Sequence, residues 1–136
     1  MQTKIIHILG ASGAGVTTWG RAVAKEFGYT QLDSDDYFWL PTDPKFTNKR
    51  PKEQRIDLMR QDLENADRVV ISGTFCNWGN VFIPYFELVI NLTTPTPLRL
   101  ERLKARERDQ FGARIEPDGD MHQNHLDFMA WAAQYD

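Results

Sequence analysis

The sequence has little of what secreted, membrane-spanning or nucleic-acid-binding proteins usually carry. Its 136 residues include one cysteine, Cys76, so the chain cannot form a disulfide within itself. No apolar run approaches the roughly 20 residues that span a membrane, and the apolar start KIIHIL stops at a glycine, too early for a signal-peptide core. The net charge of −3 gives no basic field for nonspecific binding of nucleic acid. These absences predict a cytoplasmic protein without membrane or nucleic-acid partners.

Strand and helix signals alternate along the chain. Short β-branched or apolar runs predict strands at residues 4–9, 29–33, 68–73 and 86–92. Helical spacing and capping signals predict helices at residues 18–28, 53–67, 97–109 and 122–136. We expect Thr17 or Thr18 to cap the first of these helices. The alternation predicts an α/β fold in which helices cover both faces of a parallel sheet.

A glycine-rich stretch, GASGAGVTT, lies between the first predicted strand and the first predicted helix. Glycines allow positive φ and close approach of the backbone to a ligand, so that successive N–H groups point into one anion-binding concavity at the helix N-terminus. A tight turn without a ligand is the alternative, but strand, spaced glycines, threonine and helix together favour phosphate binding. The residues expected to hold the phosphates are Gly10, Ser12, Gly13, Ala14, Gly15, Val16, Thr17 and Thr18.

One residue of the phosphate-loop pattern G-x-x-x-x-G-K-[ST] is missing. Thr17 stands where the pattern has its Mg²⁺-binding hydroxyl, but Val16 stands where it has lysine. That lysine would reach the β- and γ-phosphates and neutralise charge during transfer. Either another cation takes this role, or the loop binds nucleotide and transfers phosphate poorly.

The helix predicted at residues 97–109 is rich in arginine. Arg99, Arg102 and Arg106 follow one another at spacings of three and four, so they share a helix face. The helix follows the fourth predicted strand, which places its start near the carboxyl edge of the sheet, where ligands bind in such folds. It leads into a glycine-proline loop that contains Arg114 and looks like a mobile lid. The alternative is a solvated helix held by surface ion pairs.

HILGASGAGVTT, DSDD and RERDQFGARI, in this order, resemble the adenylate kinase-like P-loop kinases, a group that includes nucleoside monophosphate kinases and shikimate kinase. A bacterial subgroup in which the loop lysine is commonly replaced is the nearer resemblance. It implies a three-layer P-loop NTPase fold, with residues 1–136 forming one domain, an acceptor-binding segment at about 35–65 and an arginine-bearing lid at about 106–121. It also implies ATP and Mg²⁺ as cofactors and a small molecule as phosphate acceptor.

The resemblance assigns roles to the arginines. Arg102 and Arg106 match the R-x-x-x-R pair of these kinases, whose first arginine lies against the adenine and whose second contacts phosphates. Arg114 matches a lid arginine that closes over the transferred phosphate. Arg106 and Arg114 are therefore the expected catalytic cations in place of the missing lysine.

The resemblance also assigns roles to the acids after the second strand. Asp33 and Asp35 match the D-x-D of shikimate-type kinases, in which the second acid helps to place Mg²⁺ and the acceptor; Asp36 competes for this role. Thr17, Asp33 and Asp35 are the expected metal ligands, and Asp35 is also an expected catalytic residue. An acidic turn or helix cap is the alternative for DSDD.

The segment that follows, residues 37–55, stands where such kinases hold the acceptor. Three aromatic residues in a row, Tyr37, Phe38 and Trp39, would either stack on a ligand ring or fill the core. Four cations would either meet an acceptor phosphate or stay solvated, namely Lys45, Lys49, Arg50 and Arg55.

The chain departs from the family pattern in two further places. No aspartate ends the third predicted strand, where the sequence reads VVISGTFCNWG. The resemblance implies a fifth parallel strand after the lid helices, whereas the sequence ends at Asp136. We expect either a C-terminal segment that is missing from this sequence or an open edge of the fourth strand, which would invite self-association. The function expected is ATP-dependent phosphoryl transfer to a small-molecule acceptor, and the alternative is a nucleotide-binding module or regulator with little or no kinase activity.

Overall fold

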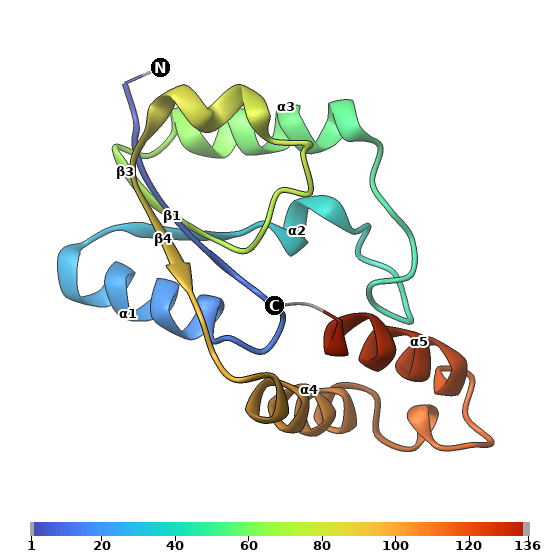
Figure 1. The fold of residues 1–136 in the computed structure, drawn as a ribbon. Helices are drawn as coiled ribbons and strands as arrows, with labels where there is room; N and C mark the ends of the chain where they lie inside the picture. Colours follow the sequence, from blue (N-terminus) through green and yellow to red (C-terminus); the bar gives the residue numbers. More distant parts are fainter. Residues whose placement is uncertain (1, 135–136) are drawn as a thin grey trace. The chain divides into compact units, whose positions relative to one another are not determined.

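The computed structural model describes residues 2–134. Their helices and strands are β1 Lys4–Gly10, α1 Val16–Phe27, β2 Thr30–Asp33, α2 Asp35–Phe38, α3 Lys52–Glu64, β3 Arg68–Ser72, the 3-10 helix η1 Asn80–Tyr85, β4 Phe86–Leu92, α4 Thr96–Phe111, the 3-10 helix η2 Gly112–Ile115 and α5 His122–Ala133 (Figure 1). None of the helices within residues 2–134 is long and apolar enough to cross a membrane.

The chain divides into two compact units. The first consists of the residues up to Gly10 together with Val16–Asn91, and the second consists of Ala11–Gly15 together with the residues from Leu92 onward. The glycine loop therefore belongs with α4, η2 and α5, whereas the strand before it and the helix after it belong to the other unit. The expectation of one domain over residues 1–136 stays a prediction.

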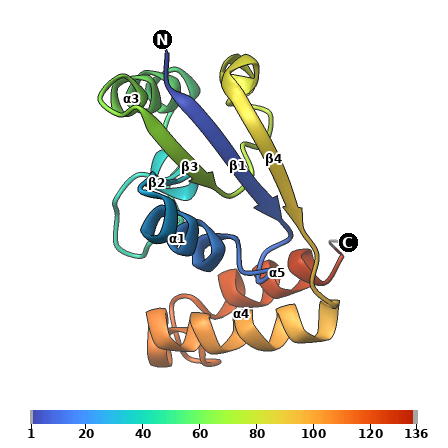
Figure 2. The same ribbon diagram turned by 90° about the vertical axis from the view of Figure 1, so that its left-hand side faces the viewer.

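A sheet with the strand order β2-β3-β1-β4 forms the centre of the first unit. β1 pairs in parallel with β3, with Ile5 opposite Val69, and β2 pairs in parallel with β3, with Leu32 opposite Ile71. Figure 2 shows the arrows of β1, β3 and β4 pointing the same way. The central strands are apolar because both of their faces are covered, as the sequence predicted.

Helices cover the two faces of this sheet. The core on one face combines side chains of β1, β3, α3 and η1, namely Ile5, Val69, Ile71, Met59, Leu63 and Phe82. Successive side chains of a strand point to opposite faces, so Val70 and Ser72 of β3 point to the other face, which α1 covers. The first unit therefore has the three layers that the sequence predicted.

Gly20 of α1 allows this helix to approach the sheet closely. A Cβ atom at Gly20 would overlap Oγ of Ser72 and lie 2.9 Å from Nε2 of Gln31. We expect Gly20→Ala to lower the free energy of unfolding by about 2 kcal/mol, because overpacking shifts the helix. Urea unfolding measures this. Gly28→Ala is the control, since that position is open and only its positive φ opposes a side chain, which costs about 1 kcal/mol.

A double variant makes the Gly20 prediction sharper. Removing the Ser72 hydroxyl in Gly20→Ala/Ser72→Ala should restore part of the lost stability, because it removes the atom that the new methyl group would overlap. Strict additivity of the two single effects would contradict the proposed contact.

His7 of β1 is buried. Its ring lies 5.0 Å from the rings of both Phe75 and Phe86, and Nε2–H donates to the carbonyl oxygen of Gly73 at 2.7 Å. Burial lowers the pKa of His7, and the hydrogen bond to Gly73 opposes this only in part. The unfolded chain therefore binds a proton at a higher pH than the folded chain does.

The lowered pKa of His7 predicts a loss of stability in acid. The penalty is absent above the ordinary histidine pKa of about 6.5, and it grows by up to about 1.4 kcal/mol per pH unit as the pH falls from there toward the pKa of the folded chain. Urea unfolding at pH 8 and pH 5 measures the loss, and His7→Gln should show a smaller one. An equal pH dependence in both proteins would contradict the role of His7.

β4 lies at one end of the sheet order. Its side chains Leu88 and Val89 point to opposite faces of the strand, and they are 51% and 53% exposed. The expectation that this edge pairs with another chain stays a prediction.

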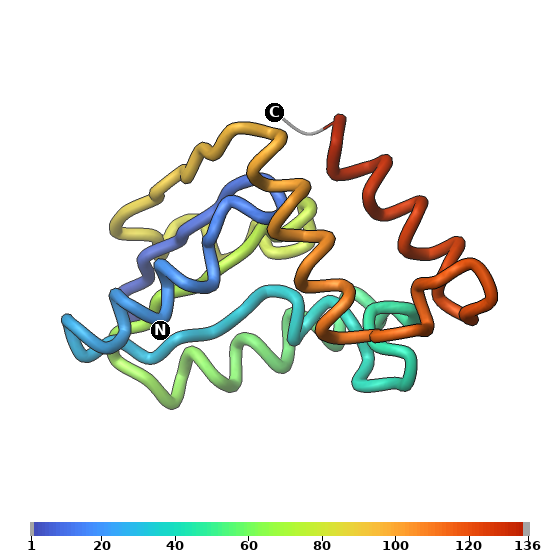
Figure 3. The backbone as a smooth tube through the Cα atoms, turned by 90° about the horizontal axis from the view of Figure 1, so that it is seen from below, coloured from blue at the N-terminus to red at the C-terminus, as the bar shows by residue number. Residues whose placement is uncertain are grey.

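The second unit is helical. α4 and α5 run in opposite directions and are joined by η2 and a short loop (Figure 3). Phe111, Ile115 and Met121 form an apolar cluster at this junction. The segment expected to be a glycine-proline loop therefore contains the end of α4 and a 3-10 helix, and its own side chains hold it together.

One expectation about local structure was wrong. α1 begins at Val16, so Thr17 and Thr18 lie in its first turn and neither caps it. The reason is that Gly15, with φ of 97°, ends the loop and the helix begins directly after it. The turn α2 and the 3-10 helix η1 were not predicted, since α2 is short and η1 contains Pro84.

Candidate functional site

The glycine loop packs against α4 within the second unit. Gly13 and Gly15 have φ values of 84° and 97°, as the spacing of the glycines predicted. A Cβ atom at Gly13 would lie 2.7 Å from the carbonyl oxygen of Arg99 and 3.1 Å from Cγ of Leu103. Two backbones thus meet at Gly13, and only glycine allows both the left-handed conformation and this approach.

Arg99 holds the loop from the side of α4. Its side chain is 1% exposed, and Nη1 donates to the carbonyl oxygens of Ser12 at 3.0 Å and Ala132 at 3.3 Å. Nη2 donates to Oγ1 of Thr96 at 3.1 Å. One guanidinium therefore joins the glycine loop, the start of α4 and the end of α5.

Sequence reasoning missed this role of Arg99. It placed Arg99 on the same helix face as Arg102 and Arg106, whereas the structure buries Arg99 and leaves the other two exposed. One signal was available. Arg99 stands one turn before Leu103, which is fully buried, so the two share the inner face of α4.

Arg102 also reaches the loop. Its Nη1 donates to the carbonyl oxygen of Gly13 at 3.3 Å, and Oγ1 of Thr94 donates to the carbonyl oxygen of Ala14 at 3.3 Å. Together with Arg99, these side chains bind the loop through its carbonyl oxygens. They do not occupy the N–H groups, which are the groups that would receive a phosphate. Arg106 follows Arg102 by one turn on the exposed face of α4.

Arg114, the predicted lid arginine, is held within the lid. Its Nε and Nη2 donate to the two carboxylate oxygens of Asp120 at 2.9 and 2.7 Å. This contact lowers the pKa of Asp120, chiefly through the hydrogen bond from Arg114. Both side chains of the pair are at least partly exposed to solvent, where such ion pairs contribute little to stability.

The predicted metal ligands lie in the first unit, and the structure brings two of them together. Oγ1 of Thr17 donates to Oδ2 of Asp33 at 2.9 Å, while Oδ1 of Asp33 accepts from the backbone N–H of Asp35 at 3.1 Å. Mg²⁺ is usually bound by one or two carboxylates, waters and substrate phosphates. A hydroxyl beside a carboxylate fits that requirement, although the described residues contain no group of three or more His, Cys, Asp or Glu side chains that could hold a metal by themselves.

The end of β3 has a polar residue in place of the absent aspartate. Oγ of Ser72 accepts a hydrogen bond from Nε2 of Gln31 at 3.2 Å, and the same amide donates to the carbonyl oxygen of Thr17 at 3.0 Å. Gln31 was not singled out from the sequence. It fixes the first turn of α1 to the carboxyl end of the sheet.

The segment after β2 surrounds a cavity of about 310 Å³ within the first unit. Charged and aromatic side chains line it, among them Asp35, Asp36, Trp39, Lys45, Phe46 and Arg50. The three consecutive aromatic residues of this segment have different environments. Tyr37 is buried and its hydroxyl donates to Asp62, Phe38 packs against the core, and Trp39 lines the cavity.

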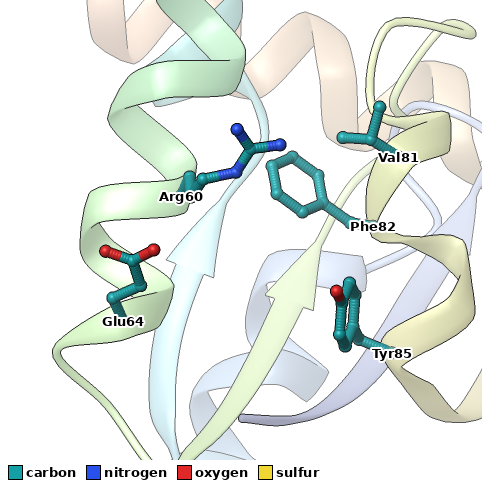
Figure 4. A pocket seen from close by; sticks show the side chains of 5 residues that line it. All are labelled: Arg60, Glu64, Val81, Phe82 and Tyr85. Atoms are coloured by element: carbon teal, nitrogen blue, oxygen red, sulfur yellow. The ribbon is translucent and has the colours of Figure 1, made fainter. Parts of the chain in front are cut away.

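A second cavity, of about 220 Å³, lies between α3 and η1 in the same unit. Arg60 and Glu64 of α3 face Val81, Phe82 and Tyr85 of η1 across it (Figure 4). None of the residues that the sequence singled out lines this cavity.

Comparison with known proteins identifies similar chains. A protein family described as the AAA domain matches residues 6–122. The uncharacterized protein YqaC of Bacillus subtilis (strain 168) is 41% identical over 133 residues, which cover 98% of this chain and 73% of that protein. The glycine loop, the DSDD segment and the arginine helix all lie within both matches.

Solved structures of kinases have a similar fold. Shikimate kinase from Acinetobacter baumannii, in complex with shikimate, matches with a TM-score of 0.53 and 20% identity over 97% of this chain and 79% of that chain. A gluconokinase from Sinorhizobium meliloti 1021 matches with a TM-score of 0.53 and 15% identity over 98% of this chain and 94% of that chain. Deoxyadenosine kinase from M. mycoides with bound dATP matches with a TM-score of 0.51 and 15% identity over 96% of this chain and 82% of that chain. At these identities the likeness shows the fold, and it confirms the predicted three-layer α/β P-loop fold.

Proposed function

The chain belongs to the protein family described as the AAA domain, among P-loop proteins of the shikimate kinase-like and adenylate kinase-like group, and from this membership we propose that it transfers a phosphoryl group from ATP to a small molecule. The observation that carries the proposal is the glycine loop, which three side chains hold by its carbonyl oxygens and not by the N–H groups that would bind phosphate. The N–H group of Ala14 donates within the loop, to the carbonyl oxygen of Ala11 at 3.0 Å.

In this proposal the protein positions the reactants and neutralises charge, since phosphoryl transfer requires little covalent chemistry of its own. Backbone N–H groups from Gly13 to Thr18, apart from that of Ala14, bind the phosphates. Thr17 and Asp33 would hold Mg²⁺, which would neutralise charge on the phosphate oxygens. Arg102, Arg106 and, after release from Asp120, Arg114 supply positive charge.

Asp35 orients the acceptor hydroxyl in this proposal and takes its proton. The hydroxyl oxygen forms a bond to the γ-phosphorus while the bond from that phosphorus to the bridging oxygen breaks, and ADP leaves. In-line transfer of this kind depends mainly on alignment of the two oxygens.

A nucleotide-binding module without transfer is the second candidate, and Val16 favours it because the loop has no lysine. Titration of ATP with and without Mg²⁺, followed by ADP production with a panel of nucleoside monophosphates and small alcohols, separates the two. Nucleotide binding without acceptor-dependent ADP formation would favour the module.

The proposal predicts a specific kinetic effect at Arg106. Arg106→Ala should lower kcat/KM at least tenfold, or about 1.4 kcal/mol, if the arginines of α4 replace the lysine. Lys104→Ala is the control, since it is another exposed cation of α4 outside the R-x-x-x-R pair. ADP production measures both.

A second change tests the same idea by rescue. Val16→Lys in the Arg106→Ala background should recover part of the rate, because its ammonium group would supply charge to the phosphates. A rate unaffected by Arg106→Ala would remove the arginine from the proposed mechanism.

A further inference from the structure

The residues that line the cavity between α3 and η1 differ from those that we assign to phosphoryl transfer. α3 contributes Arg60 and Glu64, and η1 contributes Val81, Phe82 and Tyr85 (Figure 4). Both elements belong to the first unit, so the cavity is formed entirely within it. A ligand of this cavity would therefore be separate from ATP and from the phosphate acceptor.

The wall that η1 contributes is apolar. Phe82 is 1% exposed and forms the floor of the cavity, whereas Val81 and Tyr85 are 46% and 40% exposed and stand at its rim. The side chain of Arg60 extends from α3 toward the ring of Phe82 (Figure 4). The volume of about 220 Å³ lies below the range of about 300–1,000 Å³ that is usual for ligand pockets, so the cavity suits a small molecule.

Arg60 and Glu64 give the opposite wall two charges of opposite sign. They stand four residues apart and are therefore neighbours on one face of α3. A cation that precedes an acid at this spacing is the less favourable order for a helical ion pair. Among residues 2–134 the structure gives neither side chain an ion pair or a hydrogen bond. Both charges are therefore available to a ligand.

This pair of charges selects against a ligand that carries a single charge. A carboxylate would bind the paired N–H donors of the Arg60 guanidinium, but the carboxylate of Glu64 beside it would repel that ligand. A lone ammonium group would be attracted by Glu64 and repelled by Arg60. A molecule with a carboxylate and an ammonium group close together satisfies both side chains, and an apolar group on the same molecule would gain from burial against η1.

We propose that this cavity binds a free α-amino acid with an apolar side chain. Arg60 binds its carboxylate, Glu64 binds its ammonium group, and its side chain packs on the ring of Phe82 between Val81 and Tyr85. The assignment goes beyond the proposed function, because the amino acid is neither the phosphate donor nor the acceptor. Its test uses no nucleotide, so the outcome does not depend on whether the chain transfers phosphate.

Binding of matched compounds to the full chain tests the proposal. L-Phenylalanine is compared with hydrocinnamate, which lacks the ammonium group, and with phenethylamine, which lacks the carboxylate. L-Leucine is compared in the same way with isocaproate and isoamylamine, and glycine has both charges without an apolar side chain. Calorimetric titration measures the affinities. We expect at least one of the two amino acids to bind tenfold or more tightly than both of its singly charged analogues and than glycine.

Substitutions on α3 locate the two charges. Arg60→Gln and Glu64→Gln should each reduce the affinity for the preferred amino acid at least fivefold, because each removes the partner of one ligand charge. Arg60→Gln should not weaken binding of the corresponding amine, and Glu64→Gln should not weaken binding of the corresponding acid, whereas a general disturbance of the cavity would weaken both. Lys52→Gln and Glu53→Gln are the matched controls, since these exposed charges at the start of α3 lie outside the cavity, and neither should change the affinity.

A substitution on η1 tests the apolar wall. Val81→Ser should reduce the affinity for the preferred amino acid severalfold and leave the affinity for glycine unchanged, and the exposure of Val81 means that folding should not suffer. Four results would overturn the proposal. They are singly charged analogues that bind as tightly as the amino acids, glycine that binds as tightly as both, no binding of any of these compounds, and equal effects of the cavity substitutions and the two controls.

Discussion

Replacing Arg99 by methionine is expected to lower the free energy of unfolding by about 3 kcal/mol, the largest effect of any single side chain considered for this protein. Methionine would fill the volume of the buried stem but would donate to none of the acceptors that Arg99 reaches. The carbonyl oxygens of Ser12 and Ala132 would lose this donor inside the second unit. A buried polar group that loses its partner costs about 1–3 kcal/mol, so two such groups account for the figure.

Urea unfolding measures the stability of Arg99→Met, and hydrogen exchange locates the loss. The amides of α4, α5 and the glycine loop should exchange faster, because Arg99 joins these three elements. Arg108→Met, an exposed arginine of α4, is the matched control and should change stability by less than about 0.5 kcal/mol. Equal destabilisation by the two substitutions would show that the buried hydrogen bonds contribute little.

The second large effect is expected at Gly13. A methyl group there would meet the carbonyl oxygen of Arg99 at 2.7 Å, and alanine is strained at φ of 84°. The loop would have to move away from α4, at a cost of about 2 kcal/mol or more. If phosphate binding requires the conformation that the loop has in this structure, Gly13→Ala should weaken ATP binding about thirtyfold.

Gly112→Ala is the control for Gly13→Ala. Gly112 also has positive φ, 55°, but a Cβ atom there would have no neighbour within 4 Å. It therefore reproduces the backbone strain without the overlap, and it lies in the same unit. Calorimetric titration with ATP measures both variants. An ATP affinity unaffected by Gly13→Ala would show that the loop is a turn and not a phosphate site.

The central sheet was predictable because its strands are buried on both faces. KIIHIL and RVVIS are mainly apolar runs bounded by polar residues or glycine. In a short chain such runs have few alternatives to a strand that is buried on both faces. The glycine loop was predictable for a similar reason, since its spacing between a strand and a helix demands positive φ, which the structure shows at Gly13 and Gly15.

The individual arginines were not predictable in the same way. Arg99, Arg102 and Arg106 have the same side chain and nearly the same spacing, and what separates them is the packing of the glycine loop on one side of α4. Arg50 and Arg55 differ likewise, because the ring of Phe38 binds Arg55 and the backbone carbonyl oxygen of Tyr37 orients Arg50. Contacts between residues far apart in sequence decide these roles, and a single sequence does not encode them locally.

Membership of the two units gives the missing lysine a further meaning. A lysine at position 16 would be part of α1 and of the first unit, whereas Arg102 belongs to the same unit as Ala11–Gly15 and binds that loop directly. The cations that we assign to the phosphates and the loop that we assign to hold them thus belong to one compact unit. In the proposed function, positive charge therefore comes from the unit that contains the loop, and not from the helix that follows the loop.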